Sequence, residues 1–179
     1  MNIELRQATT TDIPALEELI RASVTALSTE HYTSEQINSA LTHVFGVDTQ
    51  LIADGTYFVA EIEGQLAGSG GWSKRTTMFG GDQLKADTLD SLLDPATEAA
   101  RIRAFYVHPL WSRRGVGSRI LTACENAARA AGFSRIELVA TLPGEPLYEA
   151  RAYEKAAAMQ LKTPDGESLR AFRMTKSLK

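Results

Sequence analysis

The stretch that decides the fold is HPLWSRRGVGSR, residues 108–119, because it joins two segments of different periodicity. Before it stands ARIRAFYV, residues 100–107, a mostly apolar run that predicts a strand. After it, the apolar residues of ILTACENAARAAG, residues 120–132, recur at helical spacing. Three arginines and two glycines gather where this helix should begin. The sequence therefore predicts a strand, a glycine-containing turn and a helix in succession.

Such a turn is suited to bind an anion. The N–H groups at the start of a helix lack intrahelical partners and carry the positive end of the helix dipole, so they attract phosphate. Gly115 and Gly117 let a ligand approach this backbone, and Arg113 and Arg114 add positive side chains before it. A pyrophosphate is the ligand that this arrangement favours. The alternative is a tight turn whose arginines are only solvated.

Two common phosphate-binding motifs do not fit the stretch. A P-loop needs four residues between its glycines and then Gly-Lys-Ser or Gly-Lys-Thr, and the chain contains no such run. A dinucleotide-binding fingerprint needs a third glycine at position 120, where Ile120 stands. Neither motif is therefore indicated.

Periodicity along the rest of the chain predicts a mixed α/β fold. About six to seven strands and about four helices are expected, and residues 100–140 form a β-α-β crossover. Thr33 and Gln36 fit a capping box at the start of the second helix. Residues 73–97 lose the periodicity and predict a long surface loop. The expected strands cover residues 3–7, both halves of 56–72, 100–107, 134–140, the second half of 141–162 and 168–178, and the expected helices cover 9–27, 34–45, 115–131 and a short segment after 144.

Composition places the chain among soluble globular proteins, with 44% hydrophobic and 23% charged residues. Its 179 residues fit one domain, residues 1–179. Because no apolar run could span a bilayer and the start lacks a signal-peptide layout, we expect a cytoplasmic protein without membrane contact. The net charge of −3 argues against nucleic acid as a partner.

The few cysteines and histidines argue against disulfides and metals. Cys124 is the single cysteine and lies on an apolar helical stripe, so we expect a buried structural thiol. His31 and His43 have no second ligand at zinc-site spacing. His108, at a strand end before a proline, is expected to be a turn residue. We therefore expect no metal site.

Residues 100–159 resemble the acyl-CoA-binding core of the GNAT superfamily of N-acetyltransferases. The family has a strand that ends in V-x-P, followed by a basic pair and a turn. The turn motif is usually written Q/R-x-x-G-x-G/A. The segment from Val107 to Gly117 resembles this pattern, with Ser112 at the Gln/Arg position. Downstream, LYEARAY, residues 147–153, resembles the family's F-Y-x-x-x-G-F. The resemblance implies a mixed, mostly antiparallel sheet of about six to seven strands, flanked by about four helices.

The resemblance also implies a reaction. The protein would take acetyl-CoA as acyl donor and transfer the acetyl group to a primary amine of a small molecule, peptide or protein. Val107 would bind the pantetheine arm and offer its N–H to the thioester oxygen, and Tyr148 would protonate the leaving thiolate. For Tyr148 the alternative is a buried tyrosine that packs the short helix. The pyrophosphate would be held by Arg113, Arg114, Gly115, Val116, Gly117 and Ser118.

The general base stays unassigned, because the strand of residues 100–107 contains no carboxylate where family members often place a glutamate. Period-two alternation puts alternate residues of this strand on one face, and if that face lines the acceptor pocket the acceptor would be anionic. A catalytically silent acyl-CoA sensor is the alternative function, and family analogy suggests a homodimer. The residues of the predicted common face are Arg101, Arg103, Phe105 and Val107, and the unranked candidates for a distant base are Glu61, Glu137 and Glu145.

Overall fold

The computed structural model describes residues 2–85 and 89–179 of the chain. Within these residues it contains seven strands and six α-helices. The strands are β1 (Glu4–Gln7), β2 (Tyr57–Ile62), β3 (Gln65–Ser73), β4 (Ala100–Val107), β5 (Arg135–Thr141), β6 (Glu154–Lys162) and β7 (Ser168–Ser177), and the helices are α1 (Ile13–Leu27), α2 (Ser34–His43), α3 (Thr49–Ala53), α4 (Asp82–Lys85), α5 (Val116–Ala130) and α6 (Glu145–Ala150).

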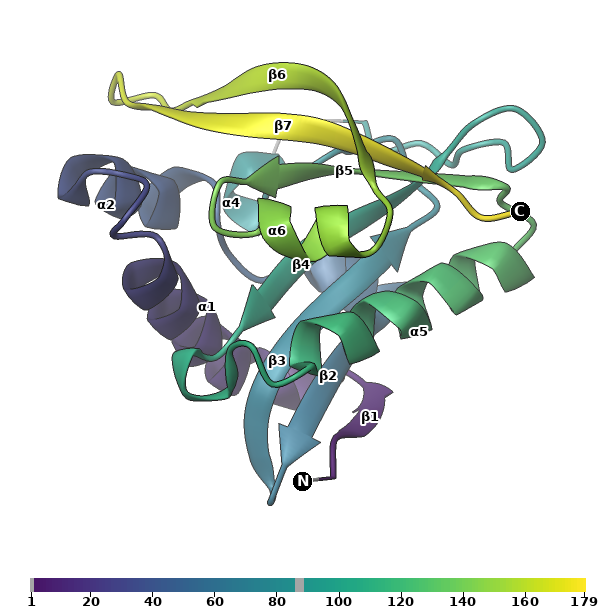
Figure 1. Ribbon diagram of the computed structural model, residues 1–179, viewed down its shortest axis with the longest axis horizontal. Coiled ribbons are helices and arrows are strands. Elements are labelled where there is room, and N and C mark those ends of the chain that lie inside the picture. The colour runs from purple at the N-terminus through teal and green to yellow at the C-terminus, as the bar shows by residue number, and fades with distance from the viewer. Residues whose placement is uncertain (1, 86–88) are drawn as a thin grey trace.

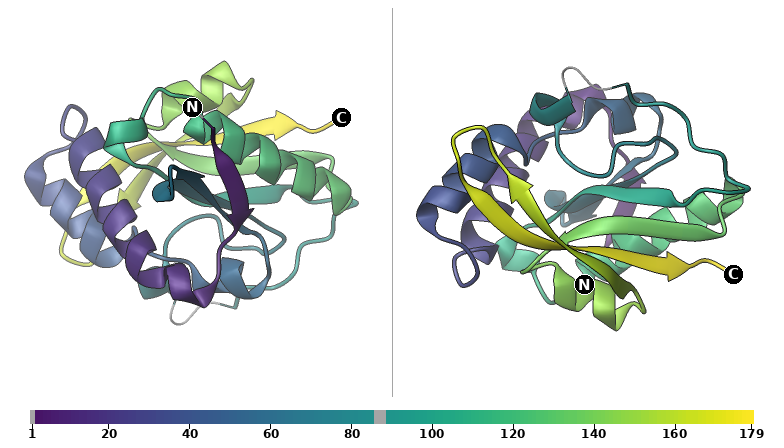
Figure 2. Two further views of the ribbon diagram at one scale, coloured as in Figure 1. Left: turned by 90° about the horizontal axis from the view of Figure 1, so that it is seen from below. Right: turned by 90° about the horizontal axis from the view of Figure 1, so that it is seen from above.

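The strands form one sheet in the order β1-β2-β3-β4-β5-β7-β6 (Figure 1). All neighbouring strands are antiparallel except β4 and β5, which are parallel and joined through α5. Helices α1 and α2 lie on one side of the sheet and α5 and α6 on the other (Figure 2). The predicted mixed α/β fold and mostly antiparallel sheet are confirmed.

Local sequence signals account for most of the elements. Helix α2 begins as predicted, since Gln36 N–H donates to Thr33 Oγ1 at 3.1 Å and Thr33 N–H donates to Gln36 Oε1 at 2.9 Å. The short helices α3 and α4 were not predicted, and α4 lies inside the loop of residues 73–97, of which 86–88 fall outside the described residues. None of the helices in the described ranges is long and apolar enough to cross a membrane.

The parallel strands β4 and β5 pair only at their first residues. The paired residues are Ala100 with Ile136 and Arg101 with Glu137. Beyond them β4 stays paired with β3, and β5 with β7, so the sheet opens between β4 and β5. The carboxyl ends of the two strands therefore have no partner on their facing edges.

A bulge in β4 lies where this divergence develops. Gly71 stands opposite Arg103 and Ser69 opposite Tyr106, so one residue of β3 faces two of β4. Ala104, one of these two, has a φ of +51°, in the left-handed region. A bulge bends its strand and increases the local twist. The side chains of β4 consequently change faces at this point.

The bulge makes the predicted common face of β4 wrong. Phe105 and Val107 pack into the core beneath α5, whereas Ala104 and Tyr106 pack into the core beneath α1 and α2. Arg103 lies on the side opposite Phe105, because the extra residue shifts the alternation by one. The expectation rested on unbroken alternation through the whole strand.

Glycines in β3 let α5 pack closely on the sheet. A Cβ at Gly68 would lie 2.8 Å from Cγ1 of Val116, the first residue of α5. A Cβ at Gly70 would lie 2.4 Å from Cδ2 of Phe105 and 2.9 Å from Cγ2 of Ile120. Such separations are shorter than carbon atoms tolerate, so both positions require glycine. These glycines therefore set the distance between the start of α5 and β4.

We predict that Gly70→Ala lowers the free energy of unfolding by about 1–3 kcal/mol, because its methyl group overpacks the contact with Phe105 and Ile120. Urea denaturation measures this change. Gly46→Ala is the matched control, since the nearest atoms to its Cβ all belong to the exposed side chain of Gln83, which can move away. Equal stabilities for the two variants would contradict the close packing.

Candidate functional site

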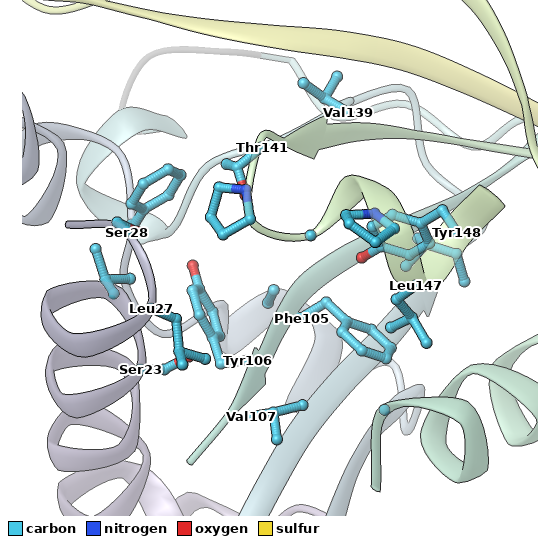
Figure 3. Close-up of a pocket in the computed structure, with 18 of the residues that line it drawn as sticks. Ser23, Leu27, Ser28, Phe105, Tyr106, Val107, Val139, Thr141, Leu147 and Tyr148 are labelled. Atoms are coloured by element: carbon cyan, nitrogen blue, oxygen red, sulfur yellow. The ribbon is translucent and has the colours of Figure 1, made fainter. Parts of the chain in front are cut away.

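A pocket with a cavity volume of about 670 Å³ opens where β4 and β5 diverge. Its walls come from these two strands, the C-terminal end of α1, the start of α5 and helix α6 (Figure 3). Elements from distant parts of the chain thus meet at the unpaired ends of the two strands. An open end of a parallel strand pair is a common place for ligands in α/β folds.

Strand β4 divides the pocket into two halves. Phe105 and Leu147 lie on the side of α5, and Tyr106 lies on the side of α1, facing Leu27 (Figure 3). We call these the α5 half and the α1 half. The α5 half is lined by Phe105, Val107, Ser112, Arg113, Gly115, Gly117, Ser118, Leu147 and Tyr148, and the α1 half by Ser23, Val24, Leu27, Ser28, His31, Phe45, Met78, Phe79, Arg103, Tyr106, Val139 and Thr141.

The start of α5 presents unpaired backbone donors to the α5 half. Gly115 caps the helix with a φ of +87°, and the first helical bond runs from Arg119 N–H to Gly115 C=O at 3.0 Å. In the described part of the chain, the N–H groups of residues 113–118 donate no hydrogen bond. Unpaired N–H groups at a helix N-terminus are the arrangement that binds phosphate.

Gly117 keeps the space beside these donors open. A Cβ at this position would lie 2.9 Å from Cδ2 of Leu147 and 3.6 Å from side-chain atoms of Phe105 and Val107. Any larger side chain would therefore occupy the α5 half. Glycine at position 117 therefore lets Leu147 pack against the first turn of α5, and close approach of a ligand to this backbone stays a prediction.

Two exposed arginines add positive charge next to the turn. Arg113 and Arg114 are both exposed, and Arg113 has a φ of +61°. The Arg114 guanidinium lies 5.3 Å from the centre of the Trp111 ring, a cation–π contact that orients it. Neither arginine makes an ion pair with another described residue. Their charge is thus available to an anion.

The N–H of Val107 faces the gap between β4 and β5. His108 N–H donates to Ala67 C=O on β3 at 2.9 Å, and Val107 stands opposite Gly68. In an antiparallel pair, residues alternate between those that bond across the ladder and those whose N–H and C=O turn outward. The Val107 N–H therefore points away from β3, towards β5.

Tyr148 borders the α5 half from helix α6. Its ring lies 5.9 Å from the Phe105 ring and 5.7 Å from the Tyr153 ring, both edge to face. The residue is only 6% exposed, and burial raises the pKa of its hydroxyl above the usual value. The phenol is consequently protonated throughout the neutral range. Its ring packs the short helix while the residue also lines the pocket.

The three glutamates considered as distant general bases, Glu61, Glu137 and Glu145, form ion pairs outside the pocket. None of the pocket-lining residues in the described part of the chain is an aspartate or glutamate. His108 is a turn residue, as expected, since its Nδ1 accepts the N–H of Leu110 at 3.2 Å. The three carboxylates form ion pairs: Glu61 with Arg6, Glu137 with Arg101, and Glu145 with Lys155.

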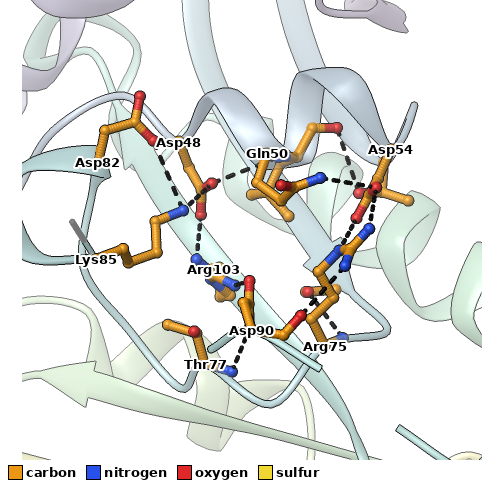
Figure 4. Close-up of polar contacts among 12 residues, drawn as sticks. Asp48, Gln50, Asp54, Arg75, Thr77, Asp82, Lys85, Asp90 and Arg103 are labelled. Carbon is orange, nitrogen blue, oxygen red and sulfur yellow. Dashed lines mark hydrogen bonds and ion pairs between the residues drawn. The ribbon is translucent and has the colours of Figure 1, made fainter. Parts of the chain in front are cut away.

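Arg103 is held by acidic residues behind the pocket wall (Figure 4). Its guanidinium is fully buried, 2.5 Å from Asp48 Oδ2 and 3.6 Å from Asp90 Oδ2. Asp48, itself fully buried, also accepts a hydrogen bond from Lys85. The positive charge of Arg103 is thus compensated within the protein. The expectation that this residue would select an anionic acceptor loses its basis.

Several residues of the α1 half were missed by the sequence analysis. Phe45, Met78, Phe79 and Tyr106 come from the end of a helix, a loop and a strand, and only the fold brings them together. One signal was present, because Met78-Phe79, like Leu92-Leu93, is an apolar pair within the mostly polar stretch of residues 73–97. Within the described residues, no group of three or more His, Cys, Asp or Glu side chains could hold a metal ion.

Solved structures share this fold. A GCN5-related N-acetyltransferase from Rhodopseudomonas palustris has a TM-score of 0.73 at 22% identity, over 99% of this chain and 96% of that one. The PaiA N-acetyltransferase of Thermoplasma acidophilum, in complex with coenzyme A, has a TM-score of 0.67 at 15% identity, over 99% of both chains. The putative acetyltransferase YncA of Salmonella typhimurium, with acetyl-CoA, has a TM-score of 0.65 at 18% identity, over 100% of this chain and 95% of that one.

Sequence comparison gives the family. No protein of curated function matches the chain. The model of the acetyltransferase (GNAT) family matches residues 15–155. This range includes strands β4 and β5, helices α5 and α6, and the residues that line both halves of the pocket. The chain therefore belongs to the acetyltransferase (GNAT) family.

Proposed function

We propose that the protein is an acetyl-CoA-dependent N-acetyltransferase that acts on a primary amine. The observation that carries the proposal is the set of unpaired N–H groups at residues 113–118, next to a pocket between β4 and β5. The structures of two relatives that contain coenzyme A or acetyl-CoA support it. The cytoplasmic location, the single domain of residues 1–179 and the homodimer stay predictions.

The residues of the α5 half fit the parts of the donor. The N–H groups of residues 113–118, with Arg113 and Arg114, hold the pyrophosphate, because a helix N-terminus and two cations together compensate its charge. The pantetheine arm lies along β4 at Val107. This places the thioester in the gap between the strands, where the acceptor enters from the α1 half.

The reaction needs a neutral amine and a place for the charge that develops on oxygen. An aliphatic amine of pKa about 10.4 is neutral in about one molecule in 2,500 at pH 7. Its nitrogen attacks the thioester carbonyl, the C–N bond forms and the C–S bond breaks. The N–H of Val107 donates to the oxyanion, a contribution that is large in enclosed sites. The thiolate leaves as a thiol once it gains a proton.

Tyr148 is the proposed donor of that proton. It lines the α5 half, and its raised pKa keeps the phenol protonated at neutral pH. The acylated nitrogen releases one proton to solvent and the Tyr148 phenolate takes one back, so the products are the N-acetyl amine and free coenzyme A thiol. Because no carboxylate lines the pocket among the described residues, an acyl-CoA sensor without turnover is the second candidate.

The decisive measurement is release of free coenzyme A thiol from acetyl-CoA in the presence of a panel of primary amines. We expect thiol release that saturates with both substrates, and calorimetric binding of coenzyme A in the micromolar to millimolar range. Binding without turnover of any amine would favour the sensor. If the protein does not bind coenzyme A at millimolar concentration, both functions are refuted.

Gly117→Leu should weaken coenzyme A binding at least about tenfold, because the added side chain occupies the α5 half between Leu147 and the strand. Isothermal titration calorimetry measures the dissociation constant. Asn126→Leu, at an exposed position of the same helix, is the matched control and should leave it unchanged. Similar affinities for both variants would place the donor elsewhere.

Tyr148→Phe should lower kcat about 100-fold or more and leave the affinity for coenzyme A unchanged, since the ring contact with Phe105 is kept and only the proton donor is lost. Steady-state kinetics with saturating acetyl-CoA give the comparison. Tyr153→Phe is the control, because Tyr153 packs on Tyr148 but does not line the pocket. Equal kcat values for the two variants would leave Tyr148 as a packing residue.

A further inference from the structure

The α1 half of the pocket has an apolar wall. Phe45 and Tyr106 form its centre, with ring centroids 6.5 Å apart in an edge-to-face contact. Phe45, Phe79 and Tyr106 also belong to the hydrophobic core beneath α1 and α2, so the wall is continuous with a packed interior. The residues that make it are Val24, Leu27, Phe45, Met78, Phe79 and Tyr106.

The polar groups of the α1 half carry little charge. Ser23, Ser28 and Thr141 contribute neutral hydroxyls, and Ser23 and Ser28 are themselves buried. Burial raises the pKa of Tyr106 well above its usual value, so its phenol is neutral as well. Among the described residues that line this half, the ionisable ones besides Tyr106 are His31, which is exposed, and Arg103.

The ion pairs of Arg103 determine how well the α1 half can bind a charged ligand. Asp48 and Asp90 already face its guanidinium, so a ligand carboxylate would have to compete with two acidic side chains. The described lining residues include no aspartate or glutamate, so a second ammonium group would also lack a counter-charge. A charged group that leaves water without gaining a counter-charge is bound unfavourably.

We propose that the acceptor is an amine whose remaining part is apolar, a hydrocarbon chain or an aromatic ring without a second charge. The inference rests on the proposed function and names the substrate class of the same site. The hydrocarbon part packs against Phe45, Met78 and Phe79, and the amine nitrogen points towards the thioester at the end of β4.

The apolar wall also favours the reactive form of the acceptor. An apolar environment disfavours the ammonium cation relative to the neutral amine, so part of the deprotonation takes place on entry. The neutral nitrogen then forms the C–N bond while the C–S bond breaks, and its proton passes to solvent. Tyr148 protonates the thiolate to the thiol and regains a proton from solvent. This sequence needs no carboxylate base within the pocket.

Matched amine pairs test the proposal directly. 2-Phenylethylamine and phenylalanine differ by one carboxylate, and pentylamine and 1,5-diaminopentane differ by one ammonium group. We expect kcat/KM for the apolar member to exceed that of its charged partner at least about tenfold in both pairs, because each extra charge enters the α1 half unpaired. A charged member used as well as, or better than, its apolar partner overturns the proposal.

A substitution in the wall provides the second test. Met78→Glu places a carboxylate on the α1 half, and should lower kcat/KM for pentylamine at least about tenfold and raise it for 1,5-diaminopentane. Met78→Gln has nearly the same shape without the charge and should leave the diamine disfavoured. Leu92→Glu, 63% exposed in the same loop and outside the pocket, is the control and should change neither value.

Two further readouts separate failure of the inference from failure of the proposed function. The KM for acetyl-CoA and the melting temperature should stay unchanged in all three variants, which excludes misfolding. If the enzyme acetylates only amines that carry a second charged group, the proposed function is kept and the inference is overturned. If coenzyme A binds but no amine reacts, the proposed function fails, and calorimetric binding of the same amine pairs to the coenzyme A complex decides the inference.

Discussion

The short pairing of β4 with β5 is the constraint on which the site depends. Two residue pairs hold the strands together, and beyond them each strand bonds to its other neighbour alone. The backbone groups on the facing edges are left for a ligand, and the helix that joins the strands begins at the same place. The start of α5, a free strand edge and a pocket therefore meet at this one break in the sheet.

Local signals in the sequence predicted the parts that are fixed locally. The turn at Gly115, the capping box at Thr33 and the hairpin of β2 and β3 each depend on residues close together in the chain. The succession of strand, turn and helix over residues 100–130 could therefore be predicted from its spacing and from its family resemblance. The same signals predicted about six to seven strands, and the seven strands observed lie in the segments where strands were expected.

What failed depended on contacts between distant residues. Ala104 carries no sequence mark of a left-handed conformation, since the strain comes from the register between β3 and β4. The partner of Arg103 could not be read from its neighbours, because Asp48 lies on a different element. The apolar wall was missed for the same reason, since the sequence does not distinguish the apolar pair Met78-Phe79, which lines the pocket, from Leu92-Leu93, which does not.

The bulge in β4 has an evolutionary consequence. By sending Phe105 to one side of the sheet and Tyr106 to the other, it separates the half of the pocket that we propose for the donor from the half that we propose for the acceptor. Most of the acceptor wall comes from helix ends and a loop, whose side chains can be exchanged while the strand beside the donor stays intact. Under the proposed function, descendants of this chain could thus acquire new amines through a handful of replacements without changes to the residues proposed to lie beside the thioester.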